Sequence, residues 1–203
     1  MTKEIIVSAI IGFVLGILVA PAMPFTWTGG MMNGNNMMGI GNNQMMTQID
    51  QHFIEQMIPH HEDAITMAHL ATEKAQHQEI KNLAEDIIKT QTAEIEKMQA
   101  WYKSWYGREV VLIASGFAHG MMMRSGMMGD ETDIEALENA KDFDKEFIEQ
   151  MIPHHQMAIM MSEMLKRSTN RPEMRQLADD IISAQTKEIE QMREWYRTWY
   201  GDR

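Results

Sequence analysis

Hydrophobic residues recur at steps of three and four positions along Ile80–Trp105, which is the period of one buried face of an α-helix. The apolar positions are Ile80, Leu83, Ala84, Ile87, Ile95, Met98 and Trp105. The opposite positions are charged: Lys81, Glu85, Lys89, Glu96 and Lys97. The pattern predicts a long amphipathic helix with one face turned to a core and the other to solvent.

The chain carries this pattern twice. Phe53–Gly107 aligns with Phe147–Gly201 without a gap, and about half of the aligned positions are identical. Such self-similarity indicates one supersecondary unit used twice. Each unit reads as a helical hairpin, with a break near residues 76–78 in the first unit and at residues 168–172 in the second. The second break ends in a proline suited to a first helical turn.

A single hairpin has only one stripe to bury, so two hairpins that pack as a four-helix bundle are the economical solution. We therefore expect an all-α fold, with hairpins at residues 49–107 and 142–203 and a linker at residues 108–141. Gly107 and Gly201 are expected to end helices in the left-handed cap conformation. Two separate hairpins that each pair with another chain are the alternative.

The first 24 residues read as an export signal or a membrane anchor. An uncharged run extends from Ile5 to Met23, Lys3 precedes it, and residues 20–22 offer an Ala-x-Ala-like cleavage site. Either reading places the rest of the chain outside the cytoplasm, in the periplasm or secreted, and residues 5–22 could tether it to a membrane. A buried core helix is the less favoured interpretation, because the run has no polar face.

Composition narrows the chemistry. The chain of 203 residues contains 23 Met and 0 Cys, so neither a disulfide nor a thiolate metal site can form. The formal charge of −11 argues against nucleic acid as a partner, because phosphate binding needs a basic surface. An acidic surface suits a protein that meets cations.

Two Met-rich stretches lie outside the repeat, at residues 25–48 and within the linker, and neither has a helical or strand period. Their methionines are Met31, Met32, Met37, Met38, Met45 and Met46, and then Met121, Met122, Met123, Met127 and Met128. We expect flexible loops whose thioethers are soft ligands that select Cu(I), and Ag(I) as a substitute. A low-complexity tether that contacts a membrane or a partner is the alternative.

The sequence MIPHH occurs in both units, at Met57–His61 and at Met151–His155. The candidate metal ligands are Met57, His60, His61 and Met67 in the first unit, and Met151, His154, His155, Met157, Met161 and Met164 in the second. On a helix, Met57 lies between His60 and His61 one turn away, and His154, Met157, Met161 and Met164 line one face. Imidazole suits Cu(II), Zn and other ions, and the neighbouring thioethers favour copper. Inherited packing of a repeated helix is the other interpretation.

Two glutamates recur on the buried stripe of the second arms, Glu94 and Glu188. A buried carboxylate needs a partner, and the repeated histidines are the obvious candidates. Glu94 and Glu188 are therefore expected to orient the imidazoles, with pairing to lysine as the alternative. The repeated Trp-Tyr-x-x-Trp-Tyr endings are expected to cap one end of the bundle by packing.

The segments FIEQMIPHHEDAITMA and FIEQMIPHHQMAIMMS resemble the M-I-x-H-H-x-x-A-x-x-M signature of a bacterial family, domain of unknown function 305. The resemblance implies a ferritin-like four-helix bundle and, since some exported members handle copper, metal contacts at the shared motif positions. These are Met57, His60, His61, Met67, Met151, His154, His155 and Met161. Neither repeat carries Glu-x-x-His near the motif, which argues against a di-iron enzyme.

We therefore expect an exported copper-binding protein that sequesters or transfers Cu(I) or Cu(II) and contributes to copper tolerance. Its partners would be metal ions and a copper-handling protein. Two alternatives remain: a metal-dependent redox enzyme that oxidises Cu(I), and a helical scaffold whose methionines only pack.

Overall fold

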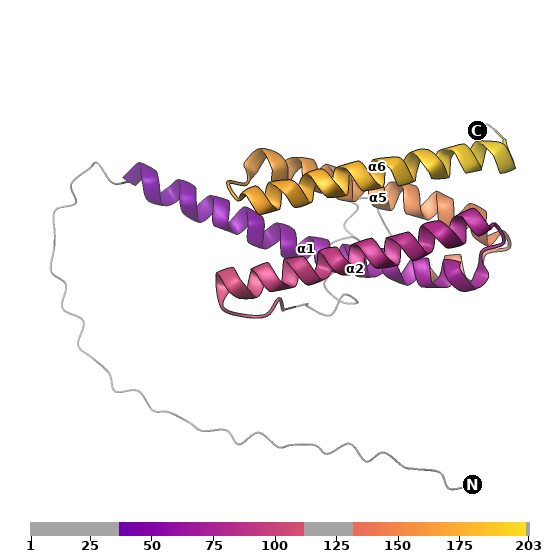
Figure 1. Ribbon diagram of the computed structural model, residues 1–203, viewed down its shortest axis with the longest axis horizontal. Coiled ribbons are helices and arrows are strands. Elements are labelled where there is room, and N and C mark those ends of the chain that lie inside the picture. The colour runs from indigo at the N-terminus through magenta and orange to yellow at the C-terminus, as the bar shows by residue number, and fades with distance from the viewer. Residues whose placement is uncertain (1–36, 112–131, 202–203) are drawn as a thin grey trace, which may run out of the picture. The chain divides into compact units, whose positions relative to one another are not determined.

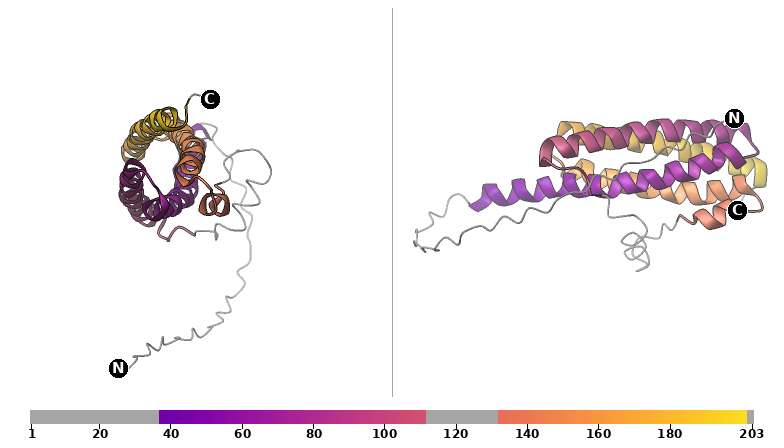
Figure 2. Two further views of the ribbon diagram at one scale, coloured as in Figure 1. Left: turned by 90° about the vertical axis from the view of Figure 1, so that its right-hand side faces the viewer. Right: turned by 90° about the horizontal axis from the view of Figure 1, so that it is seen from below.

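The computed structural model describes the backbone of residues 37–111 and 132–201, with side chains from residue 48 onward. The described residues are all-helical: α1 (Met37–Lys74), α2 (Gln78–Tyr106), α4 (Ile134–Glu138), α5 (Phe143–Ser168) and α6 (Pro172–Tyr200). α1 pairs with α2 and α5 with α6, and the two hairpins meet mainly through α1 and α5 (Figures 1 and 2). The predicted all-α fold of two repeated hairpins in a four-helix bundle is confirmed.

The helix ends follow the local sequence closely. α1 ends at Lys74 and α2 begins at Gln78, while α6 begins with Pro172 at its first turn. Gly107 has φ 68° and ψ 16°, the predicted left-handed cap. Gly201 differs, because its φ of 84° is combined with a ψ of 170°, a region open essentially only to glycine. Its amide still donates to the carbonyl of Arg197.

The Met-rich segment before the first hairpin differs from the expected loop. α1 begins at Met37, so Met37, Met38, Met45 and Met46 belong to a continuous helix. Extending an existing helix avoids the costly nucleation step, so glycines that each cost about 1 kcal/mol are tolerated. Residues 1–36, with Met31 and Met32, and residues 112–131, with the second Met-rich loop, lie outside the described residues.

Two apolar clusters fill the bundle, one toward each end. Core A joins the second half of α1, the first half of α2, Leu137 of α4, the first half of α5 and the end of α6. Core B joins the residues of α1 that precede its histidines, the second half of α2, the second half of α5 and the first half of α6. α1 and α5 therefore run antiparallel, and the repeat exchanges the two cores: Met57 lies in core B and its counterpart Met151 in core A.

Each hairpin turn is held by an aspartate of the other hairpin. Asp144 on α5 is 1% exposed and accepts hydrogen bonds from the backbone amides of Gln76 (2.9 Å) and His77 (2.8 Å). It also lies 2.6 Å from Nδ1 of His77. The equivalent Asp50 on α1 pairs with Arg171 at 3.3 Å at the start of α6. These two clamps fix the ends of the bundle.

The aromatic endings complete the same clamps. The Trp199 ring stacks on His77 with centroids 3.7 Å apart, and the Arg171 guanidinium lies 3.8 Å from the centre of the Trp105 ring. Because the hairpins are antiparallel, the two endings lie at opposite ends of the bundle. The expected packing role is therefore seen at both ends rather than at one.

A tyrosine and a glutamate tie the two helices of each hairpin together. The Tyr102 hydroxyl donates to Glu55 at 2.5 Å, and the Tyr196 hydroxyl donates to Glu149 at 2.8 Å. Burial disfavours the charged form of Glu55, but hydrogen bonds from Gln51 and Tyr102 outweigh it, so the pKa of Glu55 lies below its ordinary value. None of the helices in residues 37–111 and 132–201 is both long and apolar enough to cross a membrane.

Replacing Asp144 by Ala should destabilise the protein, because the amides of Gln76 and His77 lose their shared charged acceptor. We expect the free energy of unfolding to fall by about 2–3 kcal/mol in urea titrations followed by circular dichroism. The matched control D86A, at an exposed position on α2, should change it by less than about 0.5 kcal/mol. Equal effects of the two variants would show that the clamp contributes nothing specific.

Candidate metal centre

The two histidine pairs meet in the middle of the bundle, between core A and core B. α1 and α5 continue through Pro59 and Pro153, so neither helix begins at the motif. His60 and His154 are 4% and 2% exposed, and their ring centroids lie 3.7 Å apart at an interplanar angle of 42°. Each residue is the repeat counterpart of the other, so the rings touch where the two hairpins are related by approximate twofold symmetry.

The second histidine of each pair faces a carboxylate on the neighbouring helix. Nε2 of His61 lies 2.8 Å from Oε2 of Glu94, and Nε2 of His155 lies 2.7 Å from Oε2 of Glu188. Both imidazoles are fully buried, whereas both glutamates are 13% exposed. The carboxylates thus fix the ring orientation from the solvent side of the layer.

In the neutral form of the two rings, these contacts leave two buried lone pairs. A carboxylate only accepts hydrogen bonds, so Nε2 of each ring must carry the hydrogen, and Nδ1 of the neutral ring is then an acceptor. Nδ1 of His61 and of His155 is buried and has no hydrogen-bond partner among the described residues. The amide oxygens of Gln91 and Gln185, one turn before the glutamates, are buried without a partner too. A cation would satisfy this excess of acceptors.

We call the set His60, His61, His154, His155, Gln91, Gln185, Glu94 and Glu188 the histidine layer. Each member has its repeat counterpart in the set, and it lies between two apolar cores. The sequence favoured Glu94 and Glu188 as partners of the histidines, and the layer contains them as close neighbours of His61 and His155. Their action on a bound metal stays a prediction.

Thioethers border the layer, in a grouping that the sequence does not reveal. Met57, Met67 and Met151 are fully buried. Met57 shares core B with Met161, and Met67 shares core A with Met151, so each motif methionine lies in the same core as the partner methionine of the other repeat. Within the second repeat, Met157 and Met161 are half-buried and Met164 is 63% exposed.

No three His, Asp or Glu side chains in the described part of the chain are grouped closely enough to hold a metal ion. A site in the histidine layer would therefore use few nitrogen ligands, completed by thioether sulfur or by an amide oxygen. Low coordination by soft ligands suits a monovalent ion such as Cu(I) better than Zn²⁺ or Ca²⁺.

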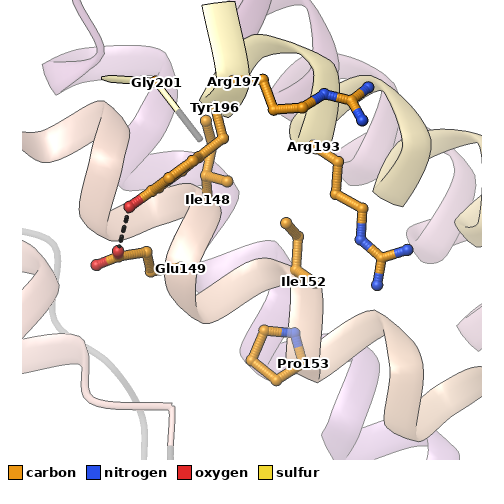
Figure 3. A pocket seen from close by; sticks show the side chains of 8 residues that line it. All are labelled: Ile148, Glu149, Ile152, Pro153, Arg193, Tyr196, Arg197 and Gly201. Carbon is orange, nitrogen blue, oxygen red and sulfur yellow. Dashed lines mark hydrogen bonds between the residues drawn. The ribbon is translucent and has the colours of Figure 1, made fainter. Parts of the chain in front are cut away.

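A groove on the outside of the second hairpin is separate from this layer. Figure 3 shows the groove between α5 and α6. Tyr196, which is hydrogen-bonded to Glu149, lines one side, and Arg193 and Arg197 line the other. None of its lining residues is a histidine or a methionine. The groove therefore offers no ligands of the kind found in the layer.

Two side-chain pairs of the structure were not predicted from the sequence, Asp50 with Arg171 and Asp144 with His77. A signal existed, because Asp50 and Asp144 occupy equivalent positions three residues before the aligned repeat begins. What the repeat could not show is that each aspartate serves the other hairpin.

Residues 50–196 match the family described as domain of unknown function (DUF305), and the chain belongs to this family, which confirms the resemblance. Solved structures of CopM in silver-bound and Cu(I)-bound forms are 49% identical to this chain, cover 75% of it and 98% of CopM, and superpose with a TM-score of 0.65. A Deinococcus radiodurans DUF305 fragment is 28% identical over 72% of this chain and 93% of its own, with a TM-score of 0.60. An uncharacterized protein of Acanthamoeba polyphaga mimivirus is 49% identical over 49 residues, which is 24% of this chain and 32% of that relative.

The geometry predicts a defined tautomer for His61 and His155. In the metal-free protein, both rings should carry hydrogen on Nε2 only, because Glu94 and Glu188 accept from that atom. Long-range proton–nitrogen NMR spectra of the imidazoles should show an unprotonated Nδ1 for these two residues at neutral pH. Signals typical of Nδ1–H would contradict the assignment, and the exposed His52 and His69 provide internal references.

Proposed function

We propose that this protein binds copper and holds Cu(I) in the histidine layer, in order to sequester it or pass it on. The observation that carries the proposal is the pair of buried Nδ1 atoms of His61 and His155, which have no hydrogen-bond partner in the part of the chain that the structure describes. In each ring, a glutamate carboxylate accepts a hydrogen bond from the other nitrogen, Nε2. This arrangement commonly orients an imidazole that binds a metal through its free nitrogen. His60 and His154 directly precede these two histidines in the sequence, and they are the next candidates for imidazole ligands.

The thioethers and the charges of the layer favour a monovalent ion. Met57 and Met151 lie one turn before the histidines and are fully buried, and thioether sulfur is a neutral, soft ligand. A buried cation needs compensating negative charge, which Glu94 and Glu188 supply at 13% exposure. One ion of charge +1 for each glutamate balances the layer, whereas divalent ions would leave excess positive charge in a mostly apolar interior.

The comparisons support copper as the cargo. CopM, at 49% identity, has been solved in Ag-bound, Cu(I)-bound and Cu(II)-bound forms. Imidazole also suits Cu(II), so both oxidation states belong to the proposal, with Ag(I) as a substitute for Cu(I). We further propose that the protein works outside the cytoplasm, contributes to copper tolerance and uses the methionines of residues 31–46 and 121–128 as auxiliary ligands.

Replacing His61 and His155 by Ala should abolish the tightest Cu(I) binding. We expect the affinity of these sites to fall by more than about a hundredfold in anaerobic competition with a Cu(I) chelator. The matched control H52A/H69A removes two exposed histidines of the first hairpin and should leave the tight sites intact. If H61A/H155A retains wild-type affinity, the histidine layer does not hold the metal.

A volume-conserving variant distinguishes the loss of a metal ligand from a loss of folding. M57L/M151L keeps both apolar cores filled and removes only the two sulfurs. It should retain wild-type helical content and bind Cu(I) more weakly than the wild type. Unchanged Cu(I) affinity would exclude these two thioethers as ligands.

The carboxylates should tune the site without binding the ion. E94Q/E188Q keeps an acceptor opposite Nε2 but removes the negative charge, so we expect Cu(I) affinity to fall by about 10–100-fold at unchanged stoichiometry. The matched control E96Q/E190Q changes two exposed glutamates of the same helices. A loss of bound equivalents in E94Q/E188Q would instead point to the glutamates as direct ligands.

A further inference from the structure

α5 carries four methionines within two turns beyond its histidine pair, at Met157, Met160, Met161 and Met164. Steps of three, one and three residues place all four within an arc of about 100° at 3.6 residues per turn. We call this set the methionine row. Its members leave the layer in the direction of the α5–α6 turn.

The row is unusually accessible for apolar side chains. Met160 is 43% exposed and Met164 is 63% exposed, and with Val111 they are the exposed large hydrophobic side chains of the described residues. Met157 and Met161 are half-buried, and Met161 packs against core B. Sulfur atoms at several depths therefore lie along one side of the helix.

The first hairpin shows that packing does not require this row. At the four equivalent positions α1 has Asp63, Thr66, Met67 and Leu70, so only one methionine is shared. Met67 is fully buried, as a core methionine would be. The same fold thus accepts a carboxylate, a hydroxyl and a branched apolar side chain where α5 has Met157, Met160 and Met164.

The row is also continuous with the histidine layer. His154 is 2% exposed and precedes Met157 by three residues. From His154 the sequence steps by three, four and three residues through Met157 and Met161 to Met164, about one helical turn of ~5.4 Å each time. Soft donors therefore follow one another from the buried imidazole to the surface.

We propose that the methionine row is a second binding site, for a monovalent soft cation, and that it loads the histidine layer through His154. Thioethers need no deprotonation and select Cu(I) and Ag(I) over hard divalent ions. The formal charge of −11 raises the concentration of cations near the surface. The site itself stands on the row alone, whereas its loading role rests on the proposed function of the histidine layer.

The test uses the full chain labelled with methyl-¹³C methionine and titrated with silver nitrate alone. The variant M157D/M160T/M164L gives α5 the residues of α1 at the equivalent positions, and the signals it loses identify Met157, Met160 and Met164. In the wild type, these methyl signals should shift once the added Ag(I) exceeds what the tighter histidine layer binds. In the variant, Ag(I) transfer from a chromophoric chelator to the histidines should slow by about tenfold or more, because tethered ligands raise the local concentration of the ion. Final occupancy of the histidines, read from imidazole ¹⁵N signals, should be unchanged.

The reverse graft provides the matched control. D63M/T66M/L70M builds the same row on α1, and it should add one further Ag(I) equivalent while the helical content stays that of the wild type. An unchanged number of bound Ag(I) ions in this variant would count against the row as a self-sufficient site.

Two results would overturn the proposal: row methyl signals that stay fixed after the histidines are filled, or wild-type transfer rates in M157D/M160T/M164L. Failure of the histidine layer is distinguishable from failure of the row. In H60A/H61A/H154A/H155A the row methyl signals should still shift with Ag(I), which supports the row as a site even where the layer binds nothing.

Discussion

The rest of the bundle depends on one constraint, the packing of the two repeated hairpins against each other, and the His60 and His154 rings meet where they do so. A hairpin used twice must pack against its own copy, and residues at the symmetry axis meet their counterparts, here with ring centroids 3.7 Å apart. Any residue placed there appears as a pair in one small volume. A histidine pair in each repeat thus becomes four imidazoles in one buried layer.

That layer is costly for folding, and the remaining structure offsets the cost. A buried polar group without a partner costs roughly 1–3 kcal/mol. Among the described residues, Nδ1 of His61 and of His155 and the amide oxygens of Gln91 and Gln185 are in that state. Core A and core B bury apolar side chains on either side of it, and the aspartate clamps hold the hairpin turns at both ends. A bound cation would recover part of the cost, which links metal binding to stability.

The sequence was sufficient for the hairpins, because the helical period and the turn at residues 168–172 are local signals. It also favoured the approach of Glu94 to the histidines, since a buried carboxylate needs a partner. It could not show that Met57 shares a core with Met161, or that Asp144 serves the turn at His77. Both depend on how the two copies pack, and the repeat alone allowed paired hairpins from different chains as well.

The two repeats have identical residues in the histidine layer and different residues around it, and this difference bears on function. The histidines, the glutamates of the layer and its glutamines are identical in both copies. Outside this layer the copies diverge: next to the histidines α1 has Glu62 and Asp63, where α5 has Gln156 and Met157. Burial, and after it the neighbouring charge of Asp63, raises the pKa of Glu62 above its ordinary value. The symmetric layer is therefore flanked by two carboxylates on the first hairpin and by an amide and a thioether on the second, a difference that agrees with the approach of a soft cation proposed along the methionine row.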